Sequence, residues 1–152
     1  MNKQIRMSAF LKPVEVRWSD LDPNFHLRHS VYYDFGAFAR ISFLEEKGLT
    51  AAVMAANQIG PILFREECVF KREIRMGDTV TIDVELLAAR EDQSRWSIRH
   101  NIWKNGNTLS AVLTVDGAWI DVAKRKLTIP PENVLHVFSA MPKSPDFSWI
   151  NK

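Results

Sequence analysis

The sequence has little of several features that would identify a function directly. It holds one cysteine, Cys68, which excludes an internal disulfide bond and any metal site built on several cysteines. Its formal net charge is only +2, without a long run of lysine and arginine, so we expect no nucleic-acid partner. No stretch approaches the roughly 18 apolar residues that a membrane span needs. These absences favour a cytoplasmic protein that binds neither nucleic acid nor a membrane.

Two catalytic signatures are also missing. The sequence has no Gly-x-Ser-x-Gly motif, which disfavours serine-hydrolase chemistry, and no glycine-rich phosphate loop. What is present is the composition of an ordinary globular protein, 46% hydrophobic and 25% charged over 152 residues. This length predicts one domain, residues 1–152, that buries about 70% of its unfolded surface.

The most informative stretch joins an alternating segment at 14–18, which predicts a strand, to a strongly apolar segment at 31–47, which predicts a helix. Ser30 is suited to cap the start of this helix, and Gly48 to end it in the left-handed conformation. Apolar residues occupy most of the helix circumference. Other structure should therefore wrap the helix.

Two carboxylates lie in the turn before that helix. Asp20 is expected to form the turn by accepting a backbone N–H two residues further on. Pro23 holds Asp22 in extended backbone, on a stiff corner beside helix N–H groups that have no intrahelical acceptor. A fixed carboxylate near free donors suits attack on a carbonyl. Spacing alone leaves two interpretations of Asp22 open, a catalytic group or an Asx turn before the proline.

The remainder of the chain reads as a sheet with a tail. Gly60-Pro61 should end a short helical segment, Asn105-Gly106 predicts a hairpin turn, and Gly117 marks a bulge or a close approach. Pro130-Pro131 should end the sheet, after which the apolar tail 131–152 docks on the surface or on a partner subunit. The expected elements are helical turns at 50–57 and strands at 62–75, 80–86, 96–102 and 109–121, the last four strands forming a meander.

Asp20-Leu21-Asp22, followed by His26 and Tyr32, resembles the opening of the 4-hydroxybenzoyl-CoA thioesterase-like hotdog proteins. That family has Asp-x-Asp, a short loop, and a long helix with an early tyrosine. The sequence departs from it at Phe25, where glycine is usual, and at Arg28, where asparagine or an aromatic residue is usual. The resemblance covers about residues 12–130. It implies an α+β hotdog fold, a curved antiparallel sheet of about five to six strands wrapped around one long central helix.

The resemblance also implies a function, the hydrolysis of an acyl-CoA or acyl-carrier-protein thioester without a cofactor. Asp22 matches the catalytic carboxylate, as nucleophile or general base, and His29 with its backbone amide lies where the carbonyl would be polarised. The residues expected to shape the substrate site are His26, Tyr32, Phe25 and Arg28. The CoA phosphates would meet Lys124-Arg125-Lys126, or Lys71-Arg72 with Arg75.

In the family, two subunits share one extended sheet and build sites at their junction. We accordingly expect a homodimer or homotetramer, in which a long strand at 62–75 does not stay exposed. His26 and His29 give only a weak metal signal, since no third ligand is in sight. His100 is expected to be a hydrogen-bonded core histidine, and Cys68 a small core hydrophobe.

Two other functions fit the same fold. Phe25 and Arg28 motivate a non-catalytic acyl-CoA-binding protein, which would keep the pocket and lose turnover. A hotdog enoyl-CoA hydratase or dehydratase would act beside the carbonyl and release no free CoA.

Overall fold

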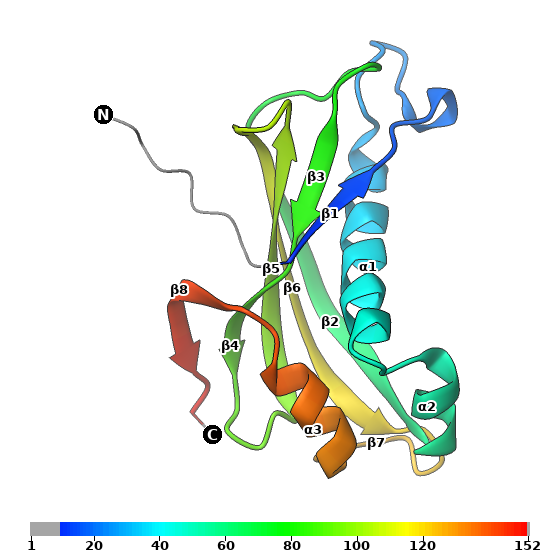
Figure 1. Cartoon of the computed structure of the whole chain (residues 1–152), viewed down its shortest axis with the longest axis vertical. Coiled ribbons are helices and arrows are strands. Elements are labelled where there is room, and N and C mark those ends of the chain that lie inside the picture. Colours follow the sequence, from blue (N-terminus) through cyan, green and yellow to red (C-terminus); the bar gives the residue numbers. More distant parts are fainter. Residues whose placement is uncertain (1–9, 152) are drawn as a thin grey trace.

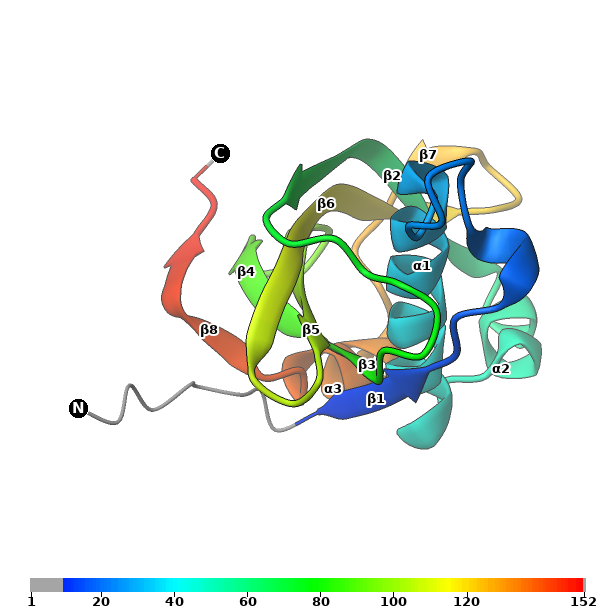
Figure 2. The same ribbon diagram turned by 90° about the horizontal axis from the view of Figure 1, so that it is seen from above.

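The structure, a computed structural model, describes residues 10–151, in which one curled sheet packs against a long helix (Figures 1 and 2). The expected domain also includes residues 1–9 and 152, which lie outside the described part. The strands are β1 (Leu11–Val14), β2 (Ile59–Phe70), β3 (Val80–Asp83), β4 (Glu85–Ala89), β5 (Arg95–Lys104), β6 (Thr108–Asp121), β7 (Lys126–Leu127) and β8 (Lys143–Trp149). The helices are the 3₁₀ turn η1 (Trp18–Asp20), α1 (His29–Glu46), α2 (Ala51–Ala56) and α3 (Glu132–Ser139).

The sheet is built on two long antiparallel strands, β5 and β6. β6 also pairs with β2, while β5 pairs with β3 near one end and with β4 near the other. β1 lies beside β3, the short β7 lies beside β6, and β8 runs parallel to β4. Figure 2, which views the molecule from above, shows the sheet curving around the helix. The α+β hotdog prediction is confirmed, with eight strands among the described residues rather than five or six.

The predicted meander was wrong in two places. β2 pairs with β6 and not with the strand that follows it, so the chain crosses over between Phe70 and Val80. The alternating stretch 80–86 is also two strands, because the path breaks at Val84 and then continues as β4. Alternation defines which face is buried, but it does not identify the neighbouring strand.

Several predicted boundaries also need correction. The first strand lies at 11–14 instead of 14–18, and Gly60-Pro61 lies inside β2, which ends at Phe70 instead of running to residue 75. Pro130-Pro131 does not end the sheet, since the tail returns to it as β8. Within the described tail, Phe138 of α3 packs against Trp119 and Trp96 of this chain's own sheet.

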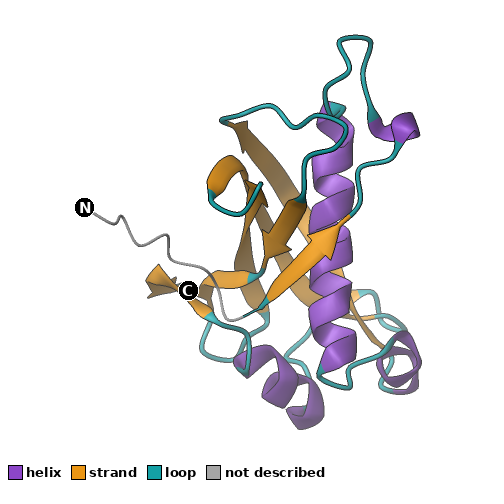
Figure 3. Cartoon of the chain, turned by 45° about the horizontal axis from the view of Figure 1, so that its top comes forward, coloured by secondary structure: helices purple, strands orange, loops and turns teal. Residues whose placement is uncertain are grey.

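The central helix is longer and less fully wrapped than its sequence predicts. It begins at His29 with Arg28 as its N-cap residue, so Ser30 is inside the helix, and Gly48 ends it with φ +89° as expected. Figure 3 shows the sheet covering one side of α1. Phe38 and Ile41, 44% and 36% exposed, lie outside that cover.

Glycines set two close approaches in the core. A Cβ placed on Gly36 of α1 would lie 2.3 Å from Cδ2 of Leu113 on β6, so only glycine lets the helix sit this close to the sheet. A Cβ on Gly117 would lie 2.4 Å from both the Ile62 carbonyl oxygen and the Trp96 ring. The β2–β6 register shifts between Leu63 and Arg65, so the bulged residue is Phe64 of β2, and Gly117 is a close approach, as one of its two predicted roles has it.

His100 is the buried histidine that the sequence predicts. Its Nδ1 lies 2.7 Å from the Asp83 carbonyl oxygen and its Nε2 lies 3.1 Å from Nη1 of Arg40. A guanidinium can only donate, so Nε2 accepts from Arg40 and Nδ1–H donates to Asp83. Burial, together with the nearby Arg40 charge, lowers the pKa of His100 to about 3. The imidazole is therefore neutral at physiological pH.

This depressed pKa predicts how acid affects folding. The unfolded chain protonates His100 below about pH 6.5 while the native chain does not, so His100 makes stability fall as the pH drops toward 3. His100→Gln keeps one donor and one acceptor but cannot titrate. Between about pH 7.5 and 4.5, the wild type should lose about 2–3 kcal/mol of unfolding free energy relative to this variant.

Urea unfolding of both proteins at the two pH values measures this difference. Burial raises the pKa of Asp83 to about 6, which gives stability the opposite slope, but Asp83 is present in both proteins. An identical pH dependence for wild type and variant would contradict a neutral, buried His100.

Candidate functional site

The loop that carries Asp22 is closed by its own hydrogen bonds. The Asp22 N–H donates to the His26 carbonyl oxygen (2.8 Å), and the Phe25 N–H donates to the Asp22 carbonyl oxygen (2.9 Å). Oδ1 of Asp22 accepts from the backbone N–H groups of Asn24 (2.8 Å) and His26 (3.1 Å). One carboxylate oxygen is thus fixed in an Asx turn. Within residues 10–151, no hydrogen bond to Oδ2 is formed.

Neighbouring segments fix this loop in place. The Leu27 N–H donates to the Ile74 carbonyl oxygen (2.7 Å), and Nε2 of His26 contacts the carboxylate of Glu73. The Arg28 N–H donates to the Asp20 carbonyl oxygen (2.7 Å), directly before α1 begins. The segment after β2 and the 3₁₀ turn therefore hold the loop from two sides.

Asp22 lines an open pocket of about 340 Å³ at the N-terminal end of α1. Four of the six predicted site residues meet there, Asp22, His26, His29 and Tyr32, together with Leu27, Phe70, Lys71, Arg72 and Glu73. Asp22 thus makes the Asx turn with one oxygen, and its side chain still borders a cavity, so the turn does not exclude the predicted catalytic role.

The other two predicted site residues are not among those that line the pocket. Phe25 is 60% exposed, and its ring lies 6.0 Å from that of Trp18. The Arg28 guanidinium donates to the Ser19 carbonyl oxygen (2.7 Å) and to Oγ of Ser30 (3.0 Å). Arg28 therefore ties the start of α1 to the 3₁₀ turn.

Asp20 has a structural place, although not by the predicted hydrogen bond. It is buried, and Oδ2 accepts from the backbone N–H of Arg17 three residues earlier (3.0 Å). The Arg17 guanidinium also donates to both carboxylate oxygens. This side-chain pairing holds the pKa of Asp20 below its usual value. Asp20 thus stabilises the 3₁₀ turn through hydrogen bonds to Arg17, which precedes it, and not to a residue that follows it.

The first turn of α1 leaves backbone donors free at the end of the helix where His29 lines the pocket. Within the described part of the chain, neither the His29 nor the Ser30 backbone N–H has an acceptor, as expected for the first residues of a helix. The helix dipole places partial positive charge at this end. Tyr32 lies one turn further on, with its ring 4.9 Å from that of Phe70. Burial raises the pKa of Tyr32 to about 12, so its hydroxyl stays protonated.

Of the two basic clusters predicted for phosphates, one borders this site. Lys71 and Arg72 line the Asp22 pocket and also an adjoining hollow of about 580 Å³. The Lys124–Lys126 cluster follows β6 and leads into β7, and Figure 1 shows β7 at the opposite end of the molecule from the loop before α1.

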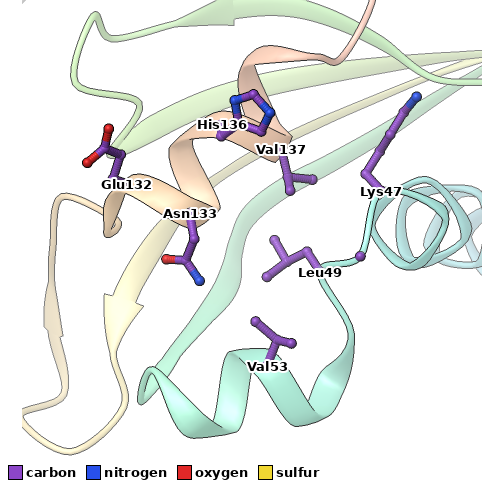
Figure 4. A pocket seen from close by; sticks show the side chains of 8 residues that line it. Lys47, Leu49, Val53, Glu132, Asn133, His136 and Val137 are labelled. Atoms are coloured by element: carbon purple, nitrogen blue, oxygen red, sulfur yellow. The ribbon is translucent and has the colours of Figure 1, made fainter.

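Another hollow, of about 590 Å³, lies away from Asp22, where the end of α1 and α2 meet α3. In Figure 4, Val137 of α3 faces Leu49 and Val53 across it. It is an open depression between packed helices. Throughout residues 10–151, no three His, Cys, Asp or Glu side chains form a group that could hold a metal ion. No helix in the same residues is long and apolar enough to cross a bilayer.

Phe70 and Glu73 line the pocket although the sequence did not indicate them as site residues. Both lie far along the chain from Asp22, and no motif connects them to it. The only available signal was the expected long strand at 62–75, whose end the sequence does not mark.

The family of the chain follows from a comparison with protein-family models. The model of the thioesterase-like superfamily matches residues 16–138, which include the Asp22 loop, α1 and the sheet from β2 to β7. The chain belongs to the thioesterase-like superfamily. A sequence comparison with curated proteins found no match.

Solved structures share the fold at low sequence identity. A 1,4-dihydroxy-2-naphthoyl-CoA thioesterase from Synechocystis aligns with a TM-score of 0.76 at 15% identity, covering 86% of this chain and 96% of that one. A hypothetical protein from Staphylococcus aureus, in complex with CoA, gives 0.78 at 19% identity, covering 99% and 94%. A thioesterase from Thermus thermophilus, complexed with coenzyme A and Zn, gives 0.73 at 22% identity, covering 88% and 96%.

The loop conformation predicts an effect at Phe25, which has φ +63°, a region that glycine adopts easily and β-branched residues avoid. Phe25→Gly and Phe25→Val both remove the ring contact with Trp18, but only valine strains the backbone. We expect the valine variant to be about 1–2 kcal/mol less stable than the glycine variant. Thermal and urea unfolding compare the two. Equal stability would show that the positive φ is not kept in solution.

Proposed function

We propose that this protein is an acyl-CoA or acyl-carrier-protein thioesterase, in which Asp22 acts on the thioester carbonyl. The observation that carries the proposal is a carboxylate with one oxygen fixed by two amides, at a pocket that begins beside the free N–H groups of α1. Asp22 attacks the carbonyl carbon directly, or it deprotonates a water that attacks. If Asp22 attacks, the C–S bond breaks to leave a mixed anhydride on Asp22, and water then hydrolyses this anhydride and regenerates the carboxylate. If water attacks, the C–S bond breaks to give the acid directly, and the proton taken up by Asp22 passes to the leaving thiolate. Both routes consume one water and yield a carboxylic acid and a thiol.

The proposed electrophilic assistance comes from the helix start. As the carbonyl oxygen gains negative charge, the His29 and Ser30 N–H groups donate to it, helped by the helix dipole. The protonated Tyr32 hydroxyl adds a donor on the same side of the pocket. His26, in contact with Glu73, acts by shaping the loop. Neither a metal ion nor a redox cofactor is required for this step.

We further propose that Lys71 and Arg72 meet the CoA phosphates, since both border the Asp22 pocket while Lys124–Lys126 does not. Within the superfamily, the Asp20-Leu21-Asp22 motif with His26 and Tyr32 supports a position near the 4-hydroxybenzoyl-CoA thioesterase-like proteins. The single cysteine fits a reducing compartment, so we propose a one-domain cytoplasmic enzyme.

A homodimer formed along β2 is part of the proposal. Within the described chain this long strand pairs only with β6, and its apolar residues Leu63, Phe64, Val69 and Phe70 are exposed. An unpaired edge of this kind favours pairing with another strand. If two copies of β2 pair antiparallel about a two-fold axis at Glu66, Arg65 of one copy lies opposite Glu67 of the other. The same axis sets Phe70, at the Asp22 pocket, opposite Ile62.

The charges at the centre of β2 test this dimer. Arg65→Glu should place like charges opposite each other and shift the protein toward monomers, while the double variant Arg65→Glu with Glu67→Arg should restore the dimer. Light scattering after size-exclusion chromatography measures the masses. A monomeric wild type would refute the dimer, and an Arg65→Glu variant that stays dimeric would refute the axis at Glu66.

The activity is tested at Asp22. Asp22→Asn keeps Oδ1 as an acceptor for the two loop amides but removes the charge, so turnover of acyl-CoA should fall at least ~100-fold while the protein stays folded. A thiol-reporting dye follows CoA release, and Asp34→Asn, an exposed carboxylate on α1, is the matched control. Wild-type rates in Asp22→Asn would remove Asp22 from the mechanism.

The same assay separates the two other functions on this fold. Binding of acyl-CoA by the wild type without thiol release would indicate a binding protein. Hydration of an enoyl-CoA without free CoA would indicate a hydratase. Either result would overturn the proposed thioesterase.

A further inference from the structure

A second cavity lies along α1, on the side of its C-terminal half. Its volume is about 250 Å³, and it is enclosed by α1, β2, β5, β6 and α3. The walls are mostly apolar, with Leu44, Trp96, Trp119 and Phe138 among them. It opens beside Ile41 and Leu63, both of which are partly exposed. The opening is therefore on the seam between α1 and β2, along which Tyr32 and Phe70 of the Asp22 pocket are also in ring contact.

The cationic group in this cavity is Arg40. The side chain is only 13% exposed, and burial lowers the pKa of the guanidinium. Of its five N–H donors, one is used on Nε2 of the neutral His100. The nearest acid from the surrounding elements is Glu66 of β2, whose Oε2 stays 4.0 Å from Nη2, too far for a hydrogen bond. The guanidinium keeps donors available on the cavity side.

Two of the residues that line the cavity also carry indole N–H donors. Nε1 of Trp96 and Nε1 of Trp119 are buried and have no hydrogen-bond partner among the described residues. Buried donors without acceptors are costly to a folded protein, by about 1–3 kcal/mol for each group. Neither indole nitrogen has accessible surface, so the donor that a ligand in this apolar cavity would meet is the Arg40 guanidinium. Such a ligand has an apolar body and acceptor oxygens at its end.

We infer that this cavity binds the far end of the acyl group, and that the preferred acyl group carries a carboxylate there. The substrate class is then the CoA monothioester of a medium-chain dicarboxylic acid. The carboxylate pairs with the Arg40 guanidinium, which can hold both of its oxygens. Glu66, which is 31% exposed, keeps contact with water when this pair forms.

The length that the acyl chain needs in order to reach Arg40 agrees with this substrate class. From His29 to Arg40 the helix rises by about 16 Å, so an acyl group that starts at the helix N-terminus must have a medium-length chain to meet Arg40. A two-fold axis at Glu66 offers a second route, from the Asp22 pocket of one copy to the cavity of the other. The inference rests on the proposed thioesterase function, but the cavity itself can be tested without turnover.

Direct binding tests the cavity. Decanoate has an apolar chain and a carboxylate, while decanol has the same chain without the charge. We expect calorimetry to give about 10- to 100-fold tighter binding of decanoate, and the fluorescence of Trp96 and Trp119 to change on binding. Arg40→Gln should abolish the difference between the two ligands, and Glu66→Gln should increase it. Equal affinities for decanoate and decanol in the wild type would refute the cavity assignment.

Turnover tests the substrate class. The kcat/KM for decanedioyl-CoA should exceed that for decanoyl-CoA by about tenfold or more, and Arg40→Gln should remove this preference. Arg40→Lys, which keeps the charge but not the planar fork, should retain part of it. Lys47→Gln, which removes an exposed cation from the end of the same helix, is the control. Equal kcat/KM values for the two thioesters would refute the dicarboxylic class.

The binding and turnover experiments can refute the cavity assignment and the thioesterase function independently of each other. Selective decanoate binding without hydrolysis of any thioester would refute the thioesterase and leave the cavity assignment standing. Hydrolysis without selective decanoate binding would do the opposite. Should Arg40→Gln not fold, the wild-type comparison of decanoate with decanol, together with Arg40→Lys, still decides the matter.

Discussion

The contact between α1 and the sheet at Gly36 sets the geometry of the whole molecule. Leu113 occupies the space that a Cβ would need, so the helix lies directly on β6. This closeness lets Arg40, one turn further along, reach His100 on β5. Any larger residue at 36 would have to lift the helix away from the sheet, and both pockets along α1 would change shape together.

The two ends of α1 then differ in their chemistry. The N-terminal end presents free N–H groups beside Asp22 and two basic residues, which suits the polar part of a thioester. The C-terminal half borders a cavity with apolar walls and an internal guanidinium. In the proposed function, the thioester bond of the substrate would break at the N-terminal end of α1. The far end of the acyl group would be recognised beside the C-terminal half of the same helix. Because the helix is rigid, the distance between the two places is fixed.

The long helix and the Asp22 loop could be predicted from local signals, while the fold class followed from the resemblance of the Asp20-Leu21-Asp22 motif, His26 and Tyr32 to a known family. Alternation identifies strands, the apolar run identifies α1, and Asp22-Pro23 identifies the corner. Strand order could not be predicted, since the pairing of β2 with β6 depends on contacts between distant segments. The same holds for the site. Asp22, His26, His29 and Tyr32 belong to one short stretch, whereas Phe70 and Glu73 reach the pocket only through the crossover after β2.

The margins of the sheet differ in a way that bears on assembly. On the far side from β2 the outer strands are β1 and β8, both short, and each contains a proline, Pro13 and Pro145. Proline has no N–H to offer to an added strand, so these margins resist extension. β2 also has a proline, Pro61, but near its beginning, which leaves a long run free. A chain with only one edge strand open to pairing can pair with a single second chain, and that pairing uses up the edge. Assembly through the sheet then ends at two chains and does not continue into a fibre.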